Sequence, residues 1–324
     1  MRTPQSLPVP PWGLAVAAMI SVQLSSAFSV GLIGQVGAAG TAWLRLSMGA
    51  IIFLAIARPP LRSIRRPDIL PLLGLGIATG LMTIMFLAAI ERIPLGTTVA
   101  IEFLGPLTVA AIRSHNRKAL AWPALALAGV VLLTEPWHGE IDALGVMFAA
   151  IAAVGWGAYI LLTQKIGDRF TGTGALSLTV PVAAVTAAIV GVPQAAGHLS
   201  LEVLLAALGV AVLMPVLPFI LEMMALRRMT SNAFGTLMSL EPAFGVLLGL
   251  LVLHQQPSIV QFIGITLVVL AGAAAQRGGQ RNPPSAEAVL GLEPPLSNGP
   301  GKVTTPASTP ASTPANTSGS SART

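Results

Sequence analysis

Four formally charged residues lie well inside long apolar runs of the sequence: Arg45, Glu102, Glu222 and Glu241. One such charge at the centre of a membrane helix costs roughly 2.5–3.5 kcal/mol on insertion scales. These side chains are therefore expected to face the interior of a helix bundle or a wet cavity. There they could bind the ammonium or carboxylate of a small solute, relay a proton, or pair as structural ions. Arg45 is the natural partner in such a pair, but one arginine cannot neutralise three glutamates.

Two proline-marked stretches, 136 residues apart, carry part of this charge. Each has a short basic turn, at Arg92 and at Arg228, followed by small residues and then by a proline, Pro106 or Pro242. Proline cannot donate a backbone hydrogen bond and disturbs the helix that contains it. Both prolines are therefore expected to break helices that line a cavity, and a kink used only for packing is the alternative.

The glutamates occupy different positions in the two stretches. At the offset of 136 residues Glu241 matches Gly105, whereas Glu102 matches Met238. Residues three apart share one face of a helix, so both carboxylates are expected to project towards one central site. Met238 is expected to line the same cavity.

Several uncharged residues are candidates for the cavity wall. Trp156 and Tyr159, the only tyrosine, flank glycines in one apolar run, and packing against these glycines is the simpler explanation for them. Gln23 lies among serines in the first run and gives it a polar stripe, although serine often bonds only its own helix.

The composition is that of a polytopic membrane protein. Hydrophobic residues make up 54% of the 324 residues and charged residues only 9%, compared with about 25% charged in soluble domains. The apolar runs approach the roughly 20 residues that cross a bilayer as a helix. They predict ten spans, near 12–34, 38–57, 69–90, 94–112, 119–134, 143–163, 173–192, 202–226, 231–252 and 258–276.

Lysine and arginine alternate between the gaps. Basic clusters occupy every second gap, and the gaps between them hold Arg92 as their only basic residue. The positive-inside rule then predicts that both termini are cytoplasmic. Because five is odd, a second set of five spans enters from the opposite side, which predicts an inverted repeat. The expected parts are a tail at 1–11, repeats at 12–134 and 143–276, and a disordered cytoplasmic tail rich in proline, serine and threonine at 277–324.

Familiar chemistry of other kinds is absent from the sequence. There is no cysteine, and the four histidines have no metal-ligand spacing, so neither a metal nor a cofactor is expected. No Walker, dinucleotide or nucleophile motif is present, which argues against an ATP-driven pump and against familiar hydrolases.

The chain resembles the drug/metabolite transporter superfamily of EamA type, and within it the inner-membrane threonine/homoserine exporters. The stretches that carry the resemblance include those beginning at Trp43, Ile93, Glu102, Leu221 and Phe234, and the last, Phe-Gly-Thr-Leu-Met-Ser-Leu-Glu-Pro-Ala, is the most specific. The resemblance covers about residues 12–276. It implies secondary-active export of small amino acids by alternating access. It also implies a cavity built from the first, third, fourth, sixth, eighth and ninth spans.

On this resemblance Glu102, Glu222 and Glu241 would bind the substrate ammonium or carry a proton, and Arg45 would hold the carboxylate or pair with them. The expected partners are a small metabolite and the lipid bilayer, with no nucleic acid, and the expected location is the bacterial inner membrane. Export of drugs or other metabolites is the alternative within the same superfamily. A polytopic membrane enzyme is the alternative from another class, but the short loops leave little room for a surface active site.

Overall fold

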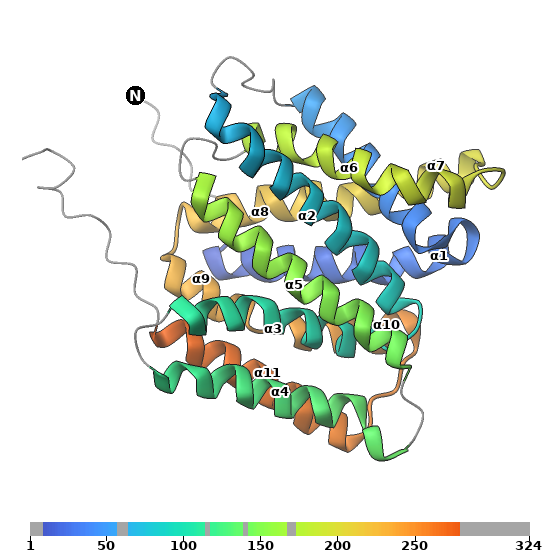
Figure 1. The fold of residues 1–324 in the computed structure, drawn as a ribbon. Helices are drawn as coiled ribbons and strands as arrows, with labels where there is room; N and C mark the ends of the chain where they lie inside the picture. The colour runs from blue at the N-terminus through green and yellow to red at the C-terminus, as the bar shows by residue number, and fades with distance from the viewer. Residues whose placement is uncertain (1–8, 57–63, 114–116, 139–141, 167–172, 279–324) are drawn as a thin grey trace, which may run out of the picture. The chain divides into compact units, whose positions relative to one another are not determined.

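The computed structural model describes residues 9–56, 64–113, 117–138, 142–166 and 173–278. Within these residues every regular element is a helix and none is a strand, as expected (Figure 1). The elements are α1 (Pro11–Ile56), α2 (Arg66–Ile90), α3 (Leu95–Arg113), η2 (Arg117–Leu120), α4 (Ala121–Thr134), η3 (Pro136–His138), α5 (Ala143–Ile166), α6 (Thr173–Ala195), α7 (Leu201–Ala211), η5 (Val212–Val216), α8 (Leu217–Leu226), α9 (Ser231–Met238), α10 (Glu241–Leu253) and α11 (Ile259–Gly278).

The helices have the surface of a membrane protein. By length and composition, seven of the described helical stretches can cross a membrane, and two further apolar helices, Lys118–Thr134 and Ile259–Ala275, are shorter. Large apolar side chains point outwards, and Leu70, Val154 and Ile189 are 78%, 74% and 74% exposed. Alanine is frequent in the interior, where small residues let membrane helices approach closely. So wide an apolar exterior is typical of a surface that faces lipid.

The longest helix, α1, is divided at Gly37, whose backbone angles are φ 73° and ψ 169°. A residue with a Cβ rarely adopts this φ, so glycine is required at this corner. The side chain of Gln194 packs against Gly37, and its Oε1 accepts a hydrogen bond of 3.0 Å from the Gly40 N–H. The division falls between the two apolar runs predicted at 12–34 and 38–57.

Proline interrupts two other stretches. The helix predicted at 231–252 is broken before Pro242, because α9 ends at Met238 and α10 begins at Glu241. The stretch predicted at 202–226 is interrupted by the π-helical η5, which contains Pro215. Serines of α1 bond two carbonyls there: Ser21 donates to Leu213 O at 2.7 Å and Ser25 to Val210 O at 2.9 Å. They satisfy backbone groups that a regular helix would have paired.

Two expectations about boundaries need correction. α3 continues through Pro106 to Arg113, so no break forms at this proline. One lost hydrogen bond is tolerated when neighbouring helices hold the segment, and α3 is packed against α5 and α10. The predicted tail at 277–324 begins too early, since Arg277 and Gly278 still belong to α11. The rest of that tail, and most of the predicted tail at 1–11, lie outside the described residues.

The helices surround a central space without all contributing to it. α1 packs against α6, α7 and α8, while α2 and α3 pack against α5. α4 and α11 lie side by side at one edge of the bundle (Figure 1). Neither of these two helices supplies a residue to the cavity described next.

Candidate functional site

A cavity of about 270 Å³ collects most of the predicted site residues. Both halves of α1 line it, together with α2, α3, α5, α6, η5, α8 and α10. Seven of the ten predicted residues are in its wall: Gln23, Arg45, Glu102, Trp156, Tyr159, Glu222 and Glu241. Met238, Pro106 and Pro242 are not, so the prediction that Met238 lines the cavity is wrong. Met238 is the last residue of α9, at the break before Glu241.

The cavity lies at the level of the helix centres. Gln23 is near the middle of the first half of α1, and Arg45 near the middle of the second half. Glu102 and Trp156 are close to the centres of α3 and α5. Glu241 stands at the break that divides the stretch 231–253. Polar groups therefore meet where a surrounding bilayer would be most apolar, and where polar groups of the chain face a cavity rather than lipid.

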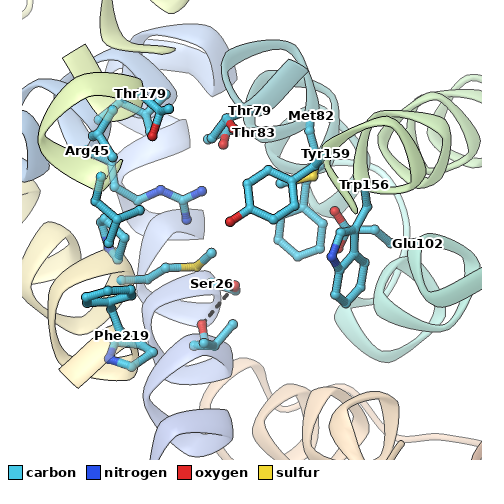
Figure 2. Close-up of a pocket in the computed structure, with 18 of the residues that line it drawn as sticks. Ser26, Arg45, Thr79, Met82, Thr83, Glu102, Trp156, Tyr159, Thr179 and Phe219 are labelled. Carbon is cyan, nitrogen blue, oxygen red and sulfur yellow. Dashed lines mark hydrogen bonds between the residues drawn. The ribbon is translucent and has the colours of Figure 1, made fainter. Parts of the chain in front are cut away.

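Arg45 enters this space from the second half of α1. Figure 2 shows its guanidinium and the ring of Tyr159 pointing into the same space from opposite sides. The side chain is 3% exposed, and its Nη1 makes no hydrogen bond. Among the described residues Arg45 forms no ion pair, although it is near enough to Glu102 to interact electrostatically. Sequence reasoning weighed a structural ion pair against a substrate contact, and no contact pair is formed.

Glu241 is held at the start of α10. It is the first residue of that helix and is 7% exposed, and its Oε2 makes no hydrogen bond. The N-terminus of a helix carries a partial positive charge that favours a nearby carboxylate. Pro242 fits here because the N–H that it lacks would have no partner in the first turn. The local sequence thus places a buried carboxylate at the helix break.

The polar stripe of the first span divides into two kinds of group. Ser21, Ser25, Ser26 and Ser29 all donate hydrogen bonds to backbone carbonyls. Gln23 is 2% exposed, and its Oε1 makes no hydrogen bond. The serines therefore hold α1 together and tie it to η5 and the end of α7. Gln23 presents a polar group to the cavity.

The two predicted aromatic residues line the cavity and also pack. Trp156 makes an edge contact with Phe103, with ring centroids 6.2 Å apart. Figure 2 shows Trp156 and Tyr159 on one side of the cavity, with Glu102 behind Trp156. Gly155 faces Met82 of α2 and leaves room for this close approach. Packing and cavity lining are both observed for this segment.

Sequence reasoning missed part of the wall. The hydroxyl groups of Thr79, Thr83 and Thr179 surround the upper part of the space in Figure 2. The resemblance implied neither the second half of α1 nor α6 as cavity elements, and both contribute. One signal was available, because Thr79 and Thr83 lie four residues apart and share one face of an otherwise apolar helix.

A second cavity, of about 240 Å³, lies between the α2–α3 turn, the ends of α3 and α4, and the starts of α5 and α11. Its polar groups are mostly paired. Arg92 Nη1 lies 3.0 Å from Asp142 Oδ2, and Ser258 donates a 2.7 Å hydrogen bond to Glu135. Hydrogen bonding by the Gly145 N–H, and then by Arg92, lowers the pKa of Asp142. No group of three or more histidine, aspartate or glutamate residues in the described part of the chain could hold a metal ion.

Comparison with known proteins gives relatives along most of the chain. The threonine/homoserine exporter RhtA of Salmonella typhimurium is 33% identical over 269 residues, which cover 82% of this chain and 91% of the relative. The protein of the same name from Escherichia coli K12 is 33% identical over 267 residues, covering 80% and 88%. A crystal structure that is 17% identical covers 82% of this chain and 98% of its own, with a TM-score of 0.56, and shares the fold.

The EamA-like transporter family matches residues 143–274, which correspond to the predicted second repeat. The relatives extend the similarity across both predicted repeats, at an identity that chance does not produce over such a length. The chain therefore belongs to the EamA-type drug/metabolite transporters.

Proposed function

We propose that this transporter exports threonine, homoserine or similar small amino acids across the bacterial inner membrane. The observation that carries the proposal is the pairing of opposite charges in one buried cavity. Arg45 and Glu241 are both more than nine-tenths buried, and each has an atom without a hydrogen-bond partner. The relatives named as threonine/homoserine exporters support the choice of substrate.

An amino acid zwitterion supplies what these two side chains lack. Its carboxylate can accept hydrogen bonds from the Arg45 guanidinium, whose planar fork suits a carboxylate. Its ammonium can donate to Glu241, with Glu102 and Glu222 as further carboxylates in the same wall. Buried charges are costly unless they are paired, so a zwitterion that pairs both at once gains affinity in this cavity.

The size of the cavity favours a small solute. Its volume of about 270 Å³ is slightly below the roughly 300–1,000 Å³ of pockets that hold drug-sized ligands. Its wall also contains apolar side chains, including Met82, Phe86 and Phe219. These can contact the short carbon chain of a substrate while the charged groups hold its two ends.

The inverted repeat supports transport by alternating access. The turn hydrogen bonds from Arg92 N to Ala89 O and from Arg228 N to Ala225 O are both 2.9 Å and lie 136 residues apart. The helices that follow, α3 and α9, begin at the same offset. The cavity wall follows it too, in five pairs of lining residues: Gln23 with Tyr159, Thr79 with Pro215, Met82 with Pro218, Thr83 with Phe219 and Phe86 with Glu222. A cavity on the pseudo-symmetry axis of two repeats is the arrangement found in many secondary carriers.

The two turn arginines also make corresponding contacts. Arg92 binds Asp142, the residue before α5, and Arg228 donates a 2.9 Å hydrogen bond to Val9 O, just before α1. Each arginine thus ties its own repeat to the start of the other. We propose ten spans with cytoplasmic termini, counting α1 as two spans, α7 to α8 as one and α9 to α10 as one.

Loading from the cytoplasm is consistent with the shape of the cavity. The wall extends to Leu176, in the first turn of α6, and to Glu222, near the end of α8. In the proposed topology both helix ends adjoin the basic, cytoplasmic gaps. The substrate would enter between these ends and leave on the opposite side after the repeats rock around it.

Efflux from cells loaded with labelled threonine tests the function. Cells that produce the protein should lose label faster than cells with an empty vector, and a Glu241→Ala variant at equal abundance should fall to the vector rate. Collapse of the proton gradient should slow efflux if the carboxylates couple transport to protons. Efflux at the vector rate for both threonine and homoserine would refute amino acid export. Competition by lipophilic drugs alone would favour drug export instead.

A further inference from the structure

Gln23 supplies a third unpaired polar atom to the same cavity. Its side chain is 2% exposed, and Oε1 accepts no hydrogen bond. Together with Nη1 of Arg45 and Oε2 of Glu241, it completes the set of buried side-chain nitrogen and oxygen atoms without a partner in the described part of the chain. All three belong to residues of one cavity wall.

The isolation of Gln23 is specific to this residue of α1. Ser26, one turn further along on the same face, donates to the Val22 carbonyl at 3.0 Å. In Figure 2 it lies in the lower part of the space that Arg45 enters. Ser29 donates to the Ser25 carbonyl at 2.8 Å. A buried acceptor without a partner is rare in a folded protein, and a ligand that donates a hydrogen bond is one explanation for it.

We propose that Gln23 makes the transporter selective for amino acids with a hydroxyl group in the side chain. This inference rests on the proposed function, because Arg45 and Glu241 must hold the ends of the zwitterion. The three unpaired atoms are a cationic donor, an anionic acceptor and a neutral acceptor. Threonine and homoserine offer the complementary set: a carboxylate, an ammonium and a neutral hydroxyl donor. Gln23 Oε1 accepts from that hydroxyl.

A single analogue isolates the hydroxyl group. Removal of the hydroxyl oxygen from either threonine or homoserine gives the same molecule, 2-aminobutyrate. This analogue keeps both charged groups and leaves the Gln23 acceptor buried and unpaired. A site built to bond a substrate hydroxyl discriminates strongly against the analogue that lacks it. The wild-type protein should transport threonine with a specificity at least about tenfold higher than that for 2-aminobutyrate.

The test measures uptake of both labelled amino acids by inverted vesicles that contain the full-length protein. Gln23→Met keeps the length of the side chain and removes the acceptor, so the preference should fall to within about twofold of unity. Ser29→Ala is the matched control, since it removes a buried polar group from the same helix outside the cavity wall. It should keep the wild-type preference. Thermal unfolding in detergent shows whether each variant is folded.

Each result bears on the proposal. A collapsed preference in Gln23→Met and a retained one in Ser29→Ala support it. An unchanged preference in a folded Gln23→Met variant overturns it. The wild-type measurement decides even if the variant does not fold, because equal transport of the two amino acids would exclude selection by the hydroxyl while leaving amino acid export intact. Transport of neither would refute the proposed function itself.

Discussion

Replacement of Arg45 by methionine distinguishes a structural arginine from one that binds substrate. Removal of one partner of a buried ion pair costs about 3–5 kcal/mol, because the other charge is left uncompensated. With about 2–4 °C per kcal/mol for chains of this size class, the melting temperature would fall on the order of 6–20 °C. An arginine that waits for a substrate has no such partner to lose.

The structure favours the second case. Arg45 forms no ion pair with the described residues, and its Nη1 is buried without a partner. Methionine removes that unpaired group, whose burial costs about 1–3 kcal/mol, and fills similar space. Arg45→Met should therefore unfold at the wild-type temperature or several degrees above it, while threonine export is lost. The double variant with Glu102→Gln controls for the electrostatic interaction between the two residues.

The assay combines thermal unfolding in detergent with export of labelled threonine from reconstituted vesicles. Arg45→Lys should also melt near the wild-type temperature, but it should transport poorly because lysine lacks the planar fork that grips a carboxylate. A melting temperature lowered by more than about 6 °C in both Arg45→Met and the double variant would refute the reasoning and identify a structural role.

Three further changes test other parts of the molecule. Glu241→Gln should insert normally and lose export, and normal export with unchanged pH dependence would remove Glu241 from the mechanism. Gly105→Val should lower the stability measured in detergent by about 1–3 kcal/mol, because a Cβ there would overlap a backbone carbonyl of α5; an unchanged melting temperature would contradict this contact. The Gly145 N–H, followed by Arg92, lowers the pKa of Asp142, so its stabilising effect is full above the ordinary value of 3.8 and is lost as pH falls through the lower value in the folded protein. Asp142→Asn should therefore melt slightly below the wild type at pH 7 and match it in strong acid, and a difference independent of pH would argue against the interaction.

The charged part of the site was predictable because the bilayer leaves few alternatives. A charge inside an apolar run must face a cavity or a partner, so Arg45, Glu102, Glu222 and Glu241 could be assigned to one interior from the sequence. All four line the cavity. Threonine carries no such signal, because its hydroxyl can bond a carbonyl of its own helix. Thr79 does so with Leu75 at 2.8 Å, and therefore resembles any packed threonine in the sequence.

The helix breaks were only partly predictable, because a proline does not decide by itself whether a membrane helix is interrupted. The break before Pro242 was expected, the one at Pro106 did not form, and the one at Pro215 was missed. At Pro215 the serines of α1 accept the cost by bonding carbonyls of a distant segment. Such partners come from elsewhere in the chain, so the local sequence cannot reveal them.

The proposed repeat relates positions in the cavity wall more closely than residue types. Gln23 stands opposite Tyr159 in the repeat and Phe86 opposite Glu222, and each pair lines the cavity with different chemistry. Glu241 has a glycine as its counterpart. A symmetric scaffold serves alternating access, because the two halves can exchange conformations around a fixed site. An amino acid is asymmetric, with a carboxylate at one side and an ammonium at the other. Divergence of the paired positions is therefore what a duplicated carrier needs to bind such a substrate in one orientation.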